Sequence, residues 1–434
     1  MLKELKAKIL NKKAKIGIIG LGYVGLPLAI TFAKKGFTVY GMDVDKDRLA
    51  KLGKGISYIL DVPSSEIRKA ISGRKFAITN DFAHIKKLDV IIICVPTPLY
   101  KTREPDVSYI VSAVENIKKY MKRGQIVILE STTYPGTTEE VMLPVLESTG
   151  LKEGKDFYLA FSPERIDPGN KKFDTKNTPK VIGGISKNST ELAKVLYEQA
   201  IDTVVPVSSS KVAEMVKLLE NTFRIVNIGM VNELMLMCDK LGVDVWEVID
   251  AAKTKPYGFM PFYPGPGVGG HCIPVDPIYL SWKARMHGFE ARFIDLASQV
   301  NSEMPQYVVS KVIEGLNNHG KPLKCSKVLI AGVAYKKDVK DLRESPALEI
   351  IDILTKKGAL VSYYDPYLPY LKIHNINLKG LEFNKNAFRD SDCVVIVTDH
   401  SNVDYDFVVK NSKLVVDTRN VLKNVKDRKN IIRL

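Results

Sequence analysis

A glycine-rich loop delivers one cysteine just ahead of a proline and a carboxylate. Residues 265–276 read Gly-Pro-Gly-Val-Gly-Gly-His-Cys-Ile-Pro-Val-Asp, and a helical pattern resumes at Asp276. Glycines allow a backbone to approach a ligand closely. We therefore expect Cys272 near a helix N-terminus, where the helix dipole and the backbone N–H groups favour the nucleophilic thiolate. A cysteine taken alone is more often a small buried apolar residue, but this loop favours a nucleophile.

A second glycine pattern lies near the start of the chain. Gly20, Gly22 and Gly25 stand between an apolar strand at residues 15–19 and an apolar helix, and Asp43 ends the following strand. In such a turn the first glycine permits the tight bend, the second admits a pyrophosphate and the third allows close helix packing. An aspartate at the end of the second strand hydrogen-bonds ribose hydroxyls, which favours NAD over NADP. The spacing alone also fits an ordinary tight turn, but all the parts in register predict a dinucleotide site.

Further candidate residues follow the next apolar strands. Thr97 follows the strand at 89–95, and Thr132 follows the strand at 125–129. Because ligands bind at the carboxyl ends of parallel strands, both threonines are expected at the edge where the cofactor binds. Glu164 and Arg165 follow a third strand and bring a carboxylate and a guanidinium together. The alternative for this pair is a surface ion pair.

A long helical pattern begins at about residue 208. Lys217 and Asn221 are four residues apart, so they share one helix face and could hold one oxygen atom from two directions. A lysine on a solvated stripe is the alternative. The apolar residues of this segment occupy more than one side, which indicates burial against a partner subunit.

Composition limits the class of protein. A chain of 434 residues predicts two or three domains. The sequence contains no apolar run long enough to span a bilayer and no signal-peptide pattern at its start, so a cytoplasmic location and no membrane partner are expected. The five cysteines form no Cys-x-x-Cys pair, so no structural metal is expected. The net charge of +15 could attract either nucleic acid or polyanionic small molecules. Because the lysines are dispersed, we interpret them mainly as solvated surface, so no nucleic-acid partner is expected and nucleic-acid binding is a minor alternative.

A second α/β region follows the helices. Short strands are expected at 327–334, 359–365, 393–399 and 414–417, and helical segments separate them, but this region lacks the Gly-x-Gly-x-x-Gly pattern. The predicted fold class is α/β, with two Rossmann-like doubly wound domains joined by a central helical dimerisation domain. The expected domains are 1–207 for NAD binding, 208–310 for the helices and the cysteine loop, and 311–434 for the second α/β sheet.

Five segments resemble a known family in order along nearly the whole chain: 20–28, 162–165, 214–224, 265–276 and 332–347. Their motifs are similar to those of the UDP-glucose/GDP-mannose dehydrogenase family. The resemblance implies a four-electron oxidation of a nucleotide sugar from the C6 alcohol through the aldehyde to the carboxylate, with two NAD+ molecules used in succession. It also implies that the domain at 311–434 binds the UDP-sugar, and that a homodimer forms through the central helices.

The resemblance also implies roles for the candidate residues. Cys272 would attack the aldehyde and give a thioester after hydride loss, and Lys217 and Asn221 would stabilise the charge on oxygen. Water for thioester hydrolysis would be positioned or activated by Glu164, Asp276 and Thr132. Beyond the three glycines of the turn, the implied NAD site comprises Tyr23, Val24, Asp43, Arg48, Thr97, Thr132 and Arg343. The implied UDP-sugar site comprises Glu164, Arg165, Lys217, Asn221, Tyr263, Gly265, Gly269, Tyr335 and Lys336.

The sugar is inferred from the flanks of these motifs. The Gly-Gly-His-Cys sequence, residues 130–137 and residues 254–265 look most like the branch that acts on UDP-N-acetylhexosamines, which serve surface polysaccharide or glycan precursor synthesis. UDP-N-acetylglucosamine is the first choice, UDP-N-acetylmannosamine the second and UDP-glucose the third. Two other classes remain open: a 3-hydroxyacid dehydrogenase, which would need neither Cys272 nor a second α/β domain, and a non-catalytic sugar-nucleotide sensor, which would need no nucleophile.

Overall fold

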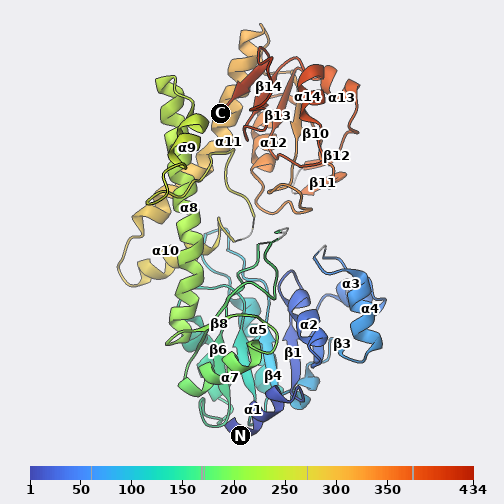
Figure 1. The fold of residues 1–434 in the computed structure, drawn as a ribbon, viewed down its shortest axis with the longest axis vertical. Coiled ribbons are helices and arrows are strands. Elements are labelled where there is room, and N and C mark those ends of the chain that lie inside the picture. The colour runs from blue at the N-terminus through green and yellow to red at the C-terminus, as the bar shows by residue number, and fades with distance from the viewer. Residues whose placement is uncertain (60, 168–169, 171, 271, 374–375) are drawn as a thin grey trace. The chain divides into compact units, whose positions relative to one another are not determined.

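The computed structural model describes residues 1–434 except 60, 168, 169, 171, 271, 374 and 375. The chain forms two compact units. The first comprises Met1–Glu220 and Ile278–Phe289, and the second comprises Asn221–Pro277 and Glu290–Leu434. Each unit contains one large sheet, drawn in blue to green for the first and in orange to red for the second (Figure 1).

In the described residues, the sheet of the first unit has the strand order β3-β2-β1-β4-β5-β6-β7-β8. Its neighbouring strands run parallel except for the antiparallel pair β6 and β7. The order reverses between β1 and β4, which is the point where doubly wound sheets bind their ligands. The strands are β1 Lys15–Ile19, β2 Thr38–Met42, β3 Phe76–Thr79, β4 Val90–Ile93, β5 Ile126–Leu129, β6 Tyr158–Phe161, β7 Lys180–Gly184 and β8 Val204–Pro206.

Helices cover both faces of this sheet, because its strands are apolar on both sides. Val90 and Ile92 of β4 pack into one buried cluster, and Ile91 and Ile93 pack into the other. The first cluster includes side chains of α1, α2, α4 and α7, and the second includes side chains of η1, α5 and α6. The helices of this unit are α1 Leu2–Leu10, α2 Gly25–Lys34, α3 Lys46–Gly53, α4 Ser64–Ser72, η1 Phe82–Lys87, α5 Ser108–Tyr120, η2 Thr138–Met142, α6 Leu143–Glu147 and α7 Lys187–Tyr197.

The sheet of the second unit is parallel, with the order β10-β9-β13-β14-β15 in the described residues. It repeats the arrangement of the first sheet, because β9 lies between β10 and β13 as β1 lies between β2 and β4. The elements are β9 Lys327–Ala331, α12 Pro346–Lys356, β10 Leu360–Tyr364, the antiparallel hairpin β11 Tyr370–Ile373 and β12 Ile376–Lys379, α13 Lys385–Arg389, β13 Cys393–Ile396, α14 Tyr405–Asn411, β14 Val415–Asp417 and β15 Ile431–Arg433.

Long helices connect the two sheets in sequence. The first is α8 Ser210–Leu241, and α9 Val245–Ala252, α10 Asp276–Met286 and α11 Arg292–Asn318 follow it. Within the second unit, Gly229 of α8 lies against Ala297 of α11, where an added methyl group would come within 3.0 Å of the Ala297 Cβ. The expected fold class is therefore confirmed. No helix in the described part of the chain has the length and apolar character that crossing a membrane requires.

Candidate active site

The turn between β1 and α2 uses its glycines in three different ways. Gly20 has φ +92°, and a Cβ there would lie 2.4 Å from the carbonyl oxygen of Cys94. A Cβ on Gly25 would lie 1.8 Å from the Gly20 carbonyl oxygen, so the helix can start this close to the strand only with glycine. At Gly22 a Cβ would meet no other described atom within 4 Å. The first and third glycines therefore build the turn, and the second leaves its outer surface accessible to a ligand.

Asp43 ties this turn to the second strand. Its Oδ2 accepts the Leu21 N–H at 2.8 Å and lies 3.5 Å from the Arg48 guanidinium, and its Oδ1 accepts the Asp45 N–H at 2.9 Å. The carboxylate is buried at the carboxyl end of β2. This arrangement fits a dinucleotide, because a ribose-binding acid at the end of β2 is hydrogen-bonded to the turn after β1 that contains the open glycine.

The other expected cofactor residues fall in both units. Thr97 is buried in the loop after β4, and its carbonyl oxygen accepts the Tyr279 hydroxyl. Tyr23 is exposed in the glycine turn, and Val24 and Thr132 are half-buried. Arg343 belongs to the second unit, where its guanidinium binds the Asp341 carboxylate with contacts of 2.7 to 3.1 Å.

Glu164 and Arg165 lie after β6 and do not pair with each other. The Glu164 Oε1 accepts the N–H groups of Arg165 and Ile166, both at 2.7 Å. The Arg165 guanidinium instead binds Glu220 of α8 through two bonds of 2.6 and 3.2 Å and donates to the Pro179 carbonyl. The alternative of a simple ion pair between these neighbours is therefore wrong.

A buried charged cluster beneath Glu164 was not predicted from the sequence. The Lys180 Nζ lies 2.5 Å from the Glu130 Oε2, and the Tyr197 hydroxyl donates to the other oxygen of Glu130. The same ammonium donates to the Pro163 carbonyl at 3.3 Å and lies 3.9 Å from the Glu164 Oε2. Burial lowers the pKa of Lys180, but the Glu130 and Glu164 carboxylates outweigh it and raise that pKa overall. Lys180 therefore stays protonated and holds the Glu164 loop to the sheet.

In the second unit, the cysteine loop meets α8 and α10. Cys272 is exposed one turn before α10, and its carbonyl accepts the Asp276 N–H at 2.9 Å. The Asp276 side chain is buried and accepts a hydrogen bond from the Asn221 amide at 2.5 Å. The expected position ahead of a helix N-terminus is confirmed, and the alternative of a buried apolar cysteine is wrong. His271 of the Gly-Gly-His-Cys motif lies outside the described residues.

Lys217 lies one helical turn before Asn221 on α8. Only 7% of Lys217 and 6% of Asn221 is exposed. A buried lysine is costly unless its charge is compensated, so a lysine on a solvated stripe is excluded.

Two glycines of the cysteine loop, Gly269 and Gly270, pack against backbone and side chains of the second unit. An added Cβ would lie 2.7 Å from the Glu344 carbonyl oxygen at Gly269, and 2.8 Å from the Tyr335 ring at Gly270. The Gly270 N–H also donates to the Arg343 carbonyl at 2.9 Å. These contacts let the loop lie directly on the segment that contains Tyr335 and Lys336. The close approach of a ligand to these glycines stays a prediction.

Two more side chains frame this loop. Tyr263 stacks on Trp246 with a centroid distance of 5.8 Å, and its hydroxyl donates to Asp250 at 2.9 Å. Arg419, which follows β14, was not singled out from the sequence. Its guanidinium lies where a Cβ on Gly265 would come within 2.6 Å, and burial lowers its pKa. Its place at the carboxyl end of a strand is the signal that could have identified it, as it did for Thr97.

These features define a class of protein. An open glycine turn with an acid at the end of the second strand is typical of an NAD-dependent oxidoreductase, and here a second α/β sheet and a cysteine loop accompany it. Three models of the UDP-glucose/GDP-mannose dehydrogenase family match the chain: the NAD binding domain at 14–201, the central domain at 211–303 and the UDP binding domain at 329–424. The chain belongs to the UDP-glucose/GDP-mannose dehydrogenase family, and its cofactor is NAD.

Individual relatives agree with this result. The chain is 40% identical over 359 residues to a UDP-N-acetyl-D-glucosamine 6-dehydrogenase of Pseudomonas aeruginosa, which covers 82% of this chain and 84% of that protein. It is 36% identical over 417 residues to a UDP-N-acetyl-D-mannosamine dehydrogenase of Pyrococcus horikoshii, which covers 94% and 96%. A solved structure of a UDP-D-ManNAc dehydrogenase from Pyrococcus horikoshii has a TM-score of 0.88 at 35% identity, over 96% of this chain and 98% of that one. Membership of this family excludes a 3-hydroxyacid dehydrogenase, and a non-catalytic sensor does not fit its enzymatic class.

The open face of Gly22 gives a first test. Gly22→Ala is expected to raise the KM for NAD+ at least about tenfold, or about 1.4 kcal/mol, because the new methyl group meets cofactor and no described protein atom. The melting temperature should stay unchanged. Gly53→Ala, at the end of α3, is the matched control, since a Cβ there also meets no described atom within 4 Å. Equal KM values for the two variants would contradict a pyrophosphate at Gly22.

The buried pair of Lys180 and Glu130 gives a second test. Lys180→Met should lower the free energy of unfolding by about 3 kcal/mol, because it leaves a buried carboxylate without its cation. The double variant with Glu130→Gln should recover part of this loss, since the fully buried side chain at position 130 then carries no charge. Urea unfolding of wild type, both single variants and the double variant measures the coupling. Strictly additive effects would show that the two charges do not stabilise each other.

Proposed function

We propose that this protein oxidises the C6 hydroxyl of a UDP-N-acetylhexosamine to the carboxylate through a covalent intermediate on Cys272, for surface polysaccharide or glycan precursor synthesis. One observation in the second unit supports the proposal. The exposed Cys272 precedes α10, and the first residue of α10, Asp276, accepts a hydrogen bond from the Asn221 amide. The turn from Cys272 to Asp276 thus joins a nucleophile to an amide of α8 that could bind oxygen. Family membership supplies the reaction class.

Bound NAD+ accepts one hydride in each of the two oxidations. In the proposed sequence, the Cys272 sulfur forms a bond to the aldehyde carbon and gives a thiohemiacetal, which becomes a thioester when its hydride leaves. Lys217 and Asn221 stabilise the negative charge on the C6 oxygen in these steps. Because one N–H of Asn221 is bound to Asp276, we assign its second N–H to that oxygen.

Hydrolysis then releases the product. Water attacks the thioester carbon, the C–S bond breaks, and the carboxylate leaves with Cys272 restored. We assign Glu164, Asp276 and Thr132 to holding and activating this water. Glu164 suits the task because one of its oxygens is fixed by two backbone N–H groups, so its other oxygen has a defined direction.

The binding sites are proposed in the same way. The NAD site comprises the glycine turn of Gly20, Gly22 and Gly25 with Tyr23, Val24, Asp43, Arg48, Thr97, Thr132 and Arg343. The UDP-sugar site comprises Glu164, Arg165, Lys217, Asn221, Tyr263, Gly265, Gly269, Tyr335 and Lys336. The proposed domains are 1–207, 208–310 and 311–434, and the UDP binding family model at 329–424 supports a UDP-sugar partner for the last of them.

Among sugars, UDP-N-acetylglucosamine is proposed first. It is the substrate in the name of the Pseudomonas aeruginosa relative, which is 40% identical. UDP-N-acetylmannosamine is the second candidate, because relatives with that name match more of the chain, up to 98%. The two sugars differ only in configuration at C2. UDP-glucose is third.

The number of NADH molecules formed per sugar consumed tests the substrate and the mechanism together. Wild type should form about two NADH per UDP-N-acetylglucosamine consumed, since each oxidation transfers one hydride. Cys272→Ala should lose this turnover, because no thioester can form. Absorbance at 340 nm with UDP-N-acetylglucosamine, UDP-N-acetylmannosamine, UDP-N-acetylgalactosamine and UDP-glucose in parallel measures both, and Cys325→Ala, at another exposed cysteine, is the control. Turnover of UDP-N-acetylmannosamine alone would overturn the sugar assignment, and turnover of none would overturn the catalytic assignment.

A homodimer is part of the proposal. One side of α8 exposes large apolar side chains, which are usually covered by protein; they are Val212, Met215, Leu219, Phe223, Met230 and Leu234. Sedimentation velocity should therefore give about twice the chain mass of 48.4 kDa. Leu219→Lys, at a side chain that is 59% exposed, should shift the species toward monomer. A monomeric wild type at micromolar concentration would contradict this assignment.

A further inference from the structure

The second sheet repeats the turn geometry of the first. Gly332, which follows β9, has φ +84°, and a Cβ there would lie 2.4 Å from the Thr398 carbonyl oxygen. Gly20 has φ +92° and the same 2.4 Å distance to the Cys94 carbonyl. In both units, the first strand thus ends in a left-handed glycine that packs against the strand across the switch point. The segment after Gly332 therefore corresponds to the cofactor turn of the first sheet.

The carboxylates at the ends of the second strands also correspond. Asp365 follows β10, and its Oδ2 accepts the N–H groups of Val333 at 2.8 Å and Ala334 at 3.1 Å. Its Oδ1 accepts the N–H of Tyr367 at 2.8 Å, just as Asp43 accepts the N–H of Asp45. Asp365 thus occupies the position that binds ribose in a dinucleotide sheet.

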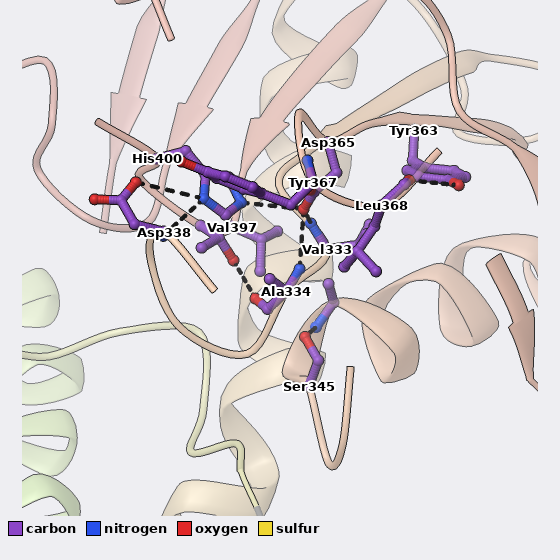
Figure 2. A network of polar contacts seen from close by, with 12 residues as sticks. Val333, Ala334, Asp338, Ser345, Tyr363, Asp365, Tyr367, Leu368, Val397 and His400 are labelled. Carbon is purple, nitrogen blue, oxygen red and sulfur yellow. Dashed lines mark hydrogen bonds and ion pairs between the residues drawn. The ribbon is translucent and has the colours of Figure 1, made fainter. Parts of the chain in front are cut away.

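In the second sheet, the side chain of His400 binds the carboxylate at this position. Its Nε2 lies 3.0 Å from the Asp365 Oδ2, and only 1% of the histidine is exposed (Figure 2). That oxygen then has three N–H groups around it, so it has no lone pair left for a ribose hydroxyl. The Tyr367 ring covers the imidazole at a centroid distance of 5.0 Å. The carboxylate that could hold a cofactor is used to hold a side chain.

The other nitrogen of His400 holds the loop after β9. The backbone N–H of Asp338 donates to the Nδ1 at 3.0 Å, which requires an unprotonated Nδ1 and assigns the proton to Nε2. Asp338 itself has φ +60°, a conformation that favours glycine. Figure 2 shows His400 between the side chains of Asp338 and Asp365, which come from two different loops.

Residues next to His400 strengthen the same connection. The Asp338 carboxylate accepts the Ser401 N–H at 2.8 Å and the Ser401 hydroxyl at 2.6 Å. These bonds, the hydroxyl first, lower the pKa of Asp338. The Thr398 hydroxyl donates to the Ala334 carbonyl at 2.6 Å. Residues 398–401 therefore bind both ends of the segment 334–338, in which Tyr335 and Lys336 stand.

We propose that His400 is a positioning residue for the UDP-sugar: by joining Asp365 to the Asp338 backbone, it fixes the loop that presents Tyr335 and Lys336. The proposal rests on the proposed function, because that function assigns these two residues to UDP-sugar binding. The bond to Asp338 is the one that acts on the loop, and the bond to Asp365 orients the ring. The same bonds occupy the Asp365 Oδ2, an oxygen that a ribose hydroxyl would otherwise use.

Two substitutions separate the two bonds of His400. Asparagine places an oxygen near the Nδ1 position and can still accept the Asp338 N–H, and glutamine places an amide near the Nε2 position and can still donate to Asp365. His400→Gln should weaken UDP binding about tenfold, and His400→Asn by no more than about threefold. His319→Gln is the control, since His319 also bonds to a backbone group in this unit but stands at the end of α11.

Isothermal titration with UDP, and hydrogen exchange of residues 332–345, measure the effects in the full-length protein without turnover. The expected result is faster exchange and weaker UDP binding in His400→Gln, with the KM for NAD+ within twofold of wild type. Unchanged exchange, or faster exchange with unchanged UDP affinity, would overturn the proposal, as would equal losses of NAD+ and UDP affinity, which indicate general destabilisation. A wild type that binds no UDP would overturn the proposed substrate, while the exchange data would still decide whether His400 holds the loop.

Discussion

A buried carboxylate at the end of the second strand organises both α/β sheets. Asp43 and Asp365 each accept backbone N–H groups from the turn that follows the first strand. Backbone N–H groups in a tight turn have no partner within the turn itself, and leaving them buried without an acceptor is costly. One carboxylate satisfies them and fixes the direction in which the turn faces. The rest of each binding surface, from the left-handed glycine to the helix start, follows from this bond.

Ion pairs fix the conformation of the loop after β6. Glu164 can act on a ligand only if its loop holds one conformation, and loops without such anchors are mobile. Lys180 anchors this loop through the Pro163 carbonyl, and Arg165 anchors it through Glu220 of α8. Each anchor is itself a charge that requires compensation, which Glu130 supplies for Lys180. The proposed catalytic carboxylate thus depends in part on the pair of Lys180 and Glu130, to which no ligand is assigned.

Sequence patterns predicted the parts of this site that depend on residues close together in the chain. The glycine turn with Asp43, the helix after Cys272 and the shared face of Lys217 and Asn221 all follow from spacing along a few turns or strands. The Lys180 and Glu130 pair, separated by 50 residues, depends on which strands become neighbours, which no local pattern encodes. His400 was missed for the same reason, because its two partners come from loops 62 and 35 residues away. The neighbours of Gly269 could not be predicted either, because a glycine indicates close approach without naming the group that approaches.

The same glycine and carboxylate geometry at the strand ends has a different use in each sheet. The second sheet keeps the left-handed glycine and the terminal carboxylate of the first, and this carboxylate stands where a dinucleotide sheet binds ribose. His400 occupies it, and a buried imidazole has a second nitrogen that must also be satisfied. That nitrogen accepts the Asp338 N–H, which transfers the rigidity of the strand end to the loop beyond it. The side chain that occupies this carboxylate is therefore the one that gives the loop a fixed conformation.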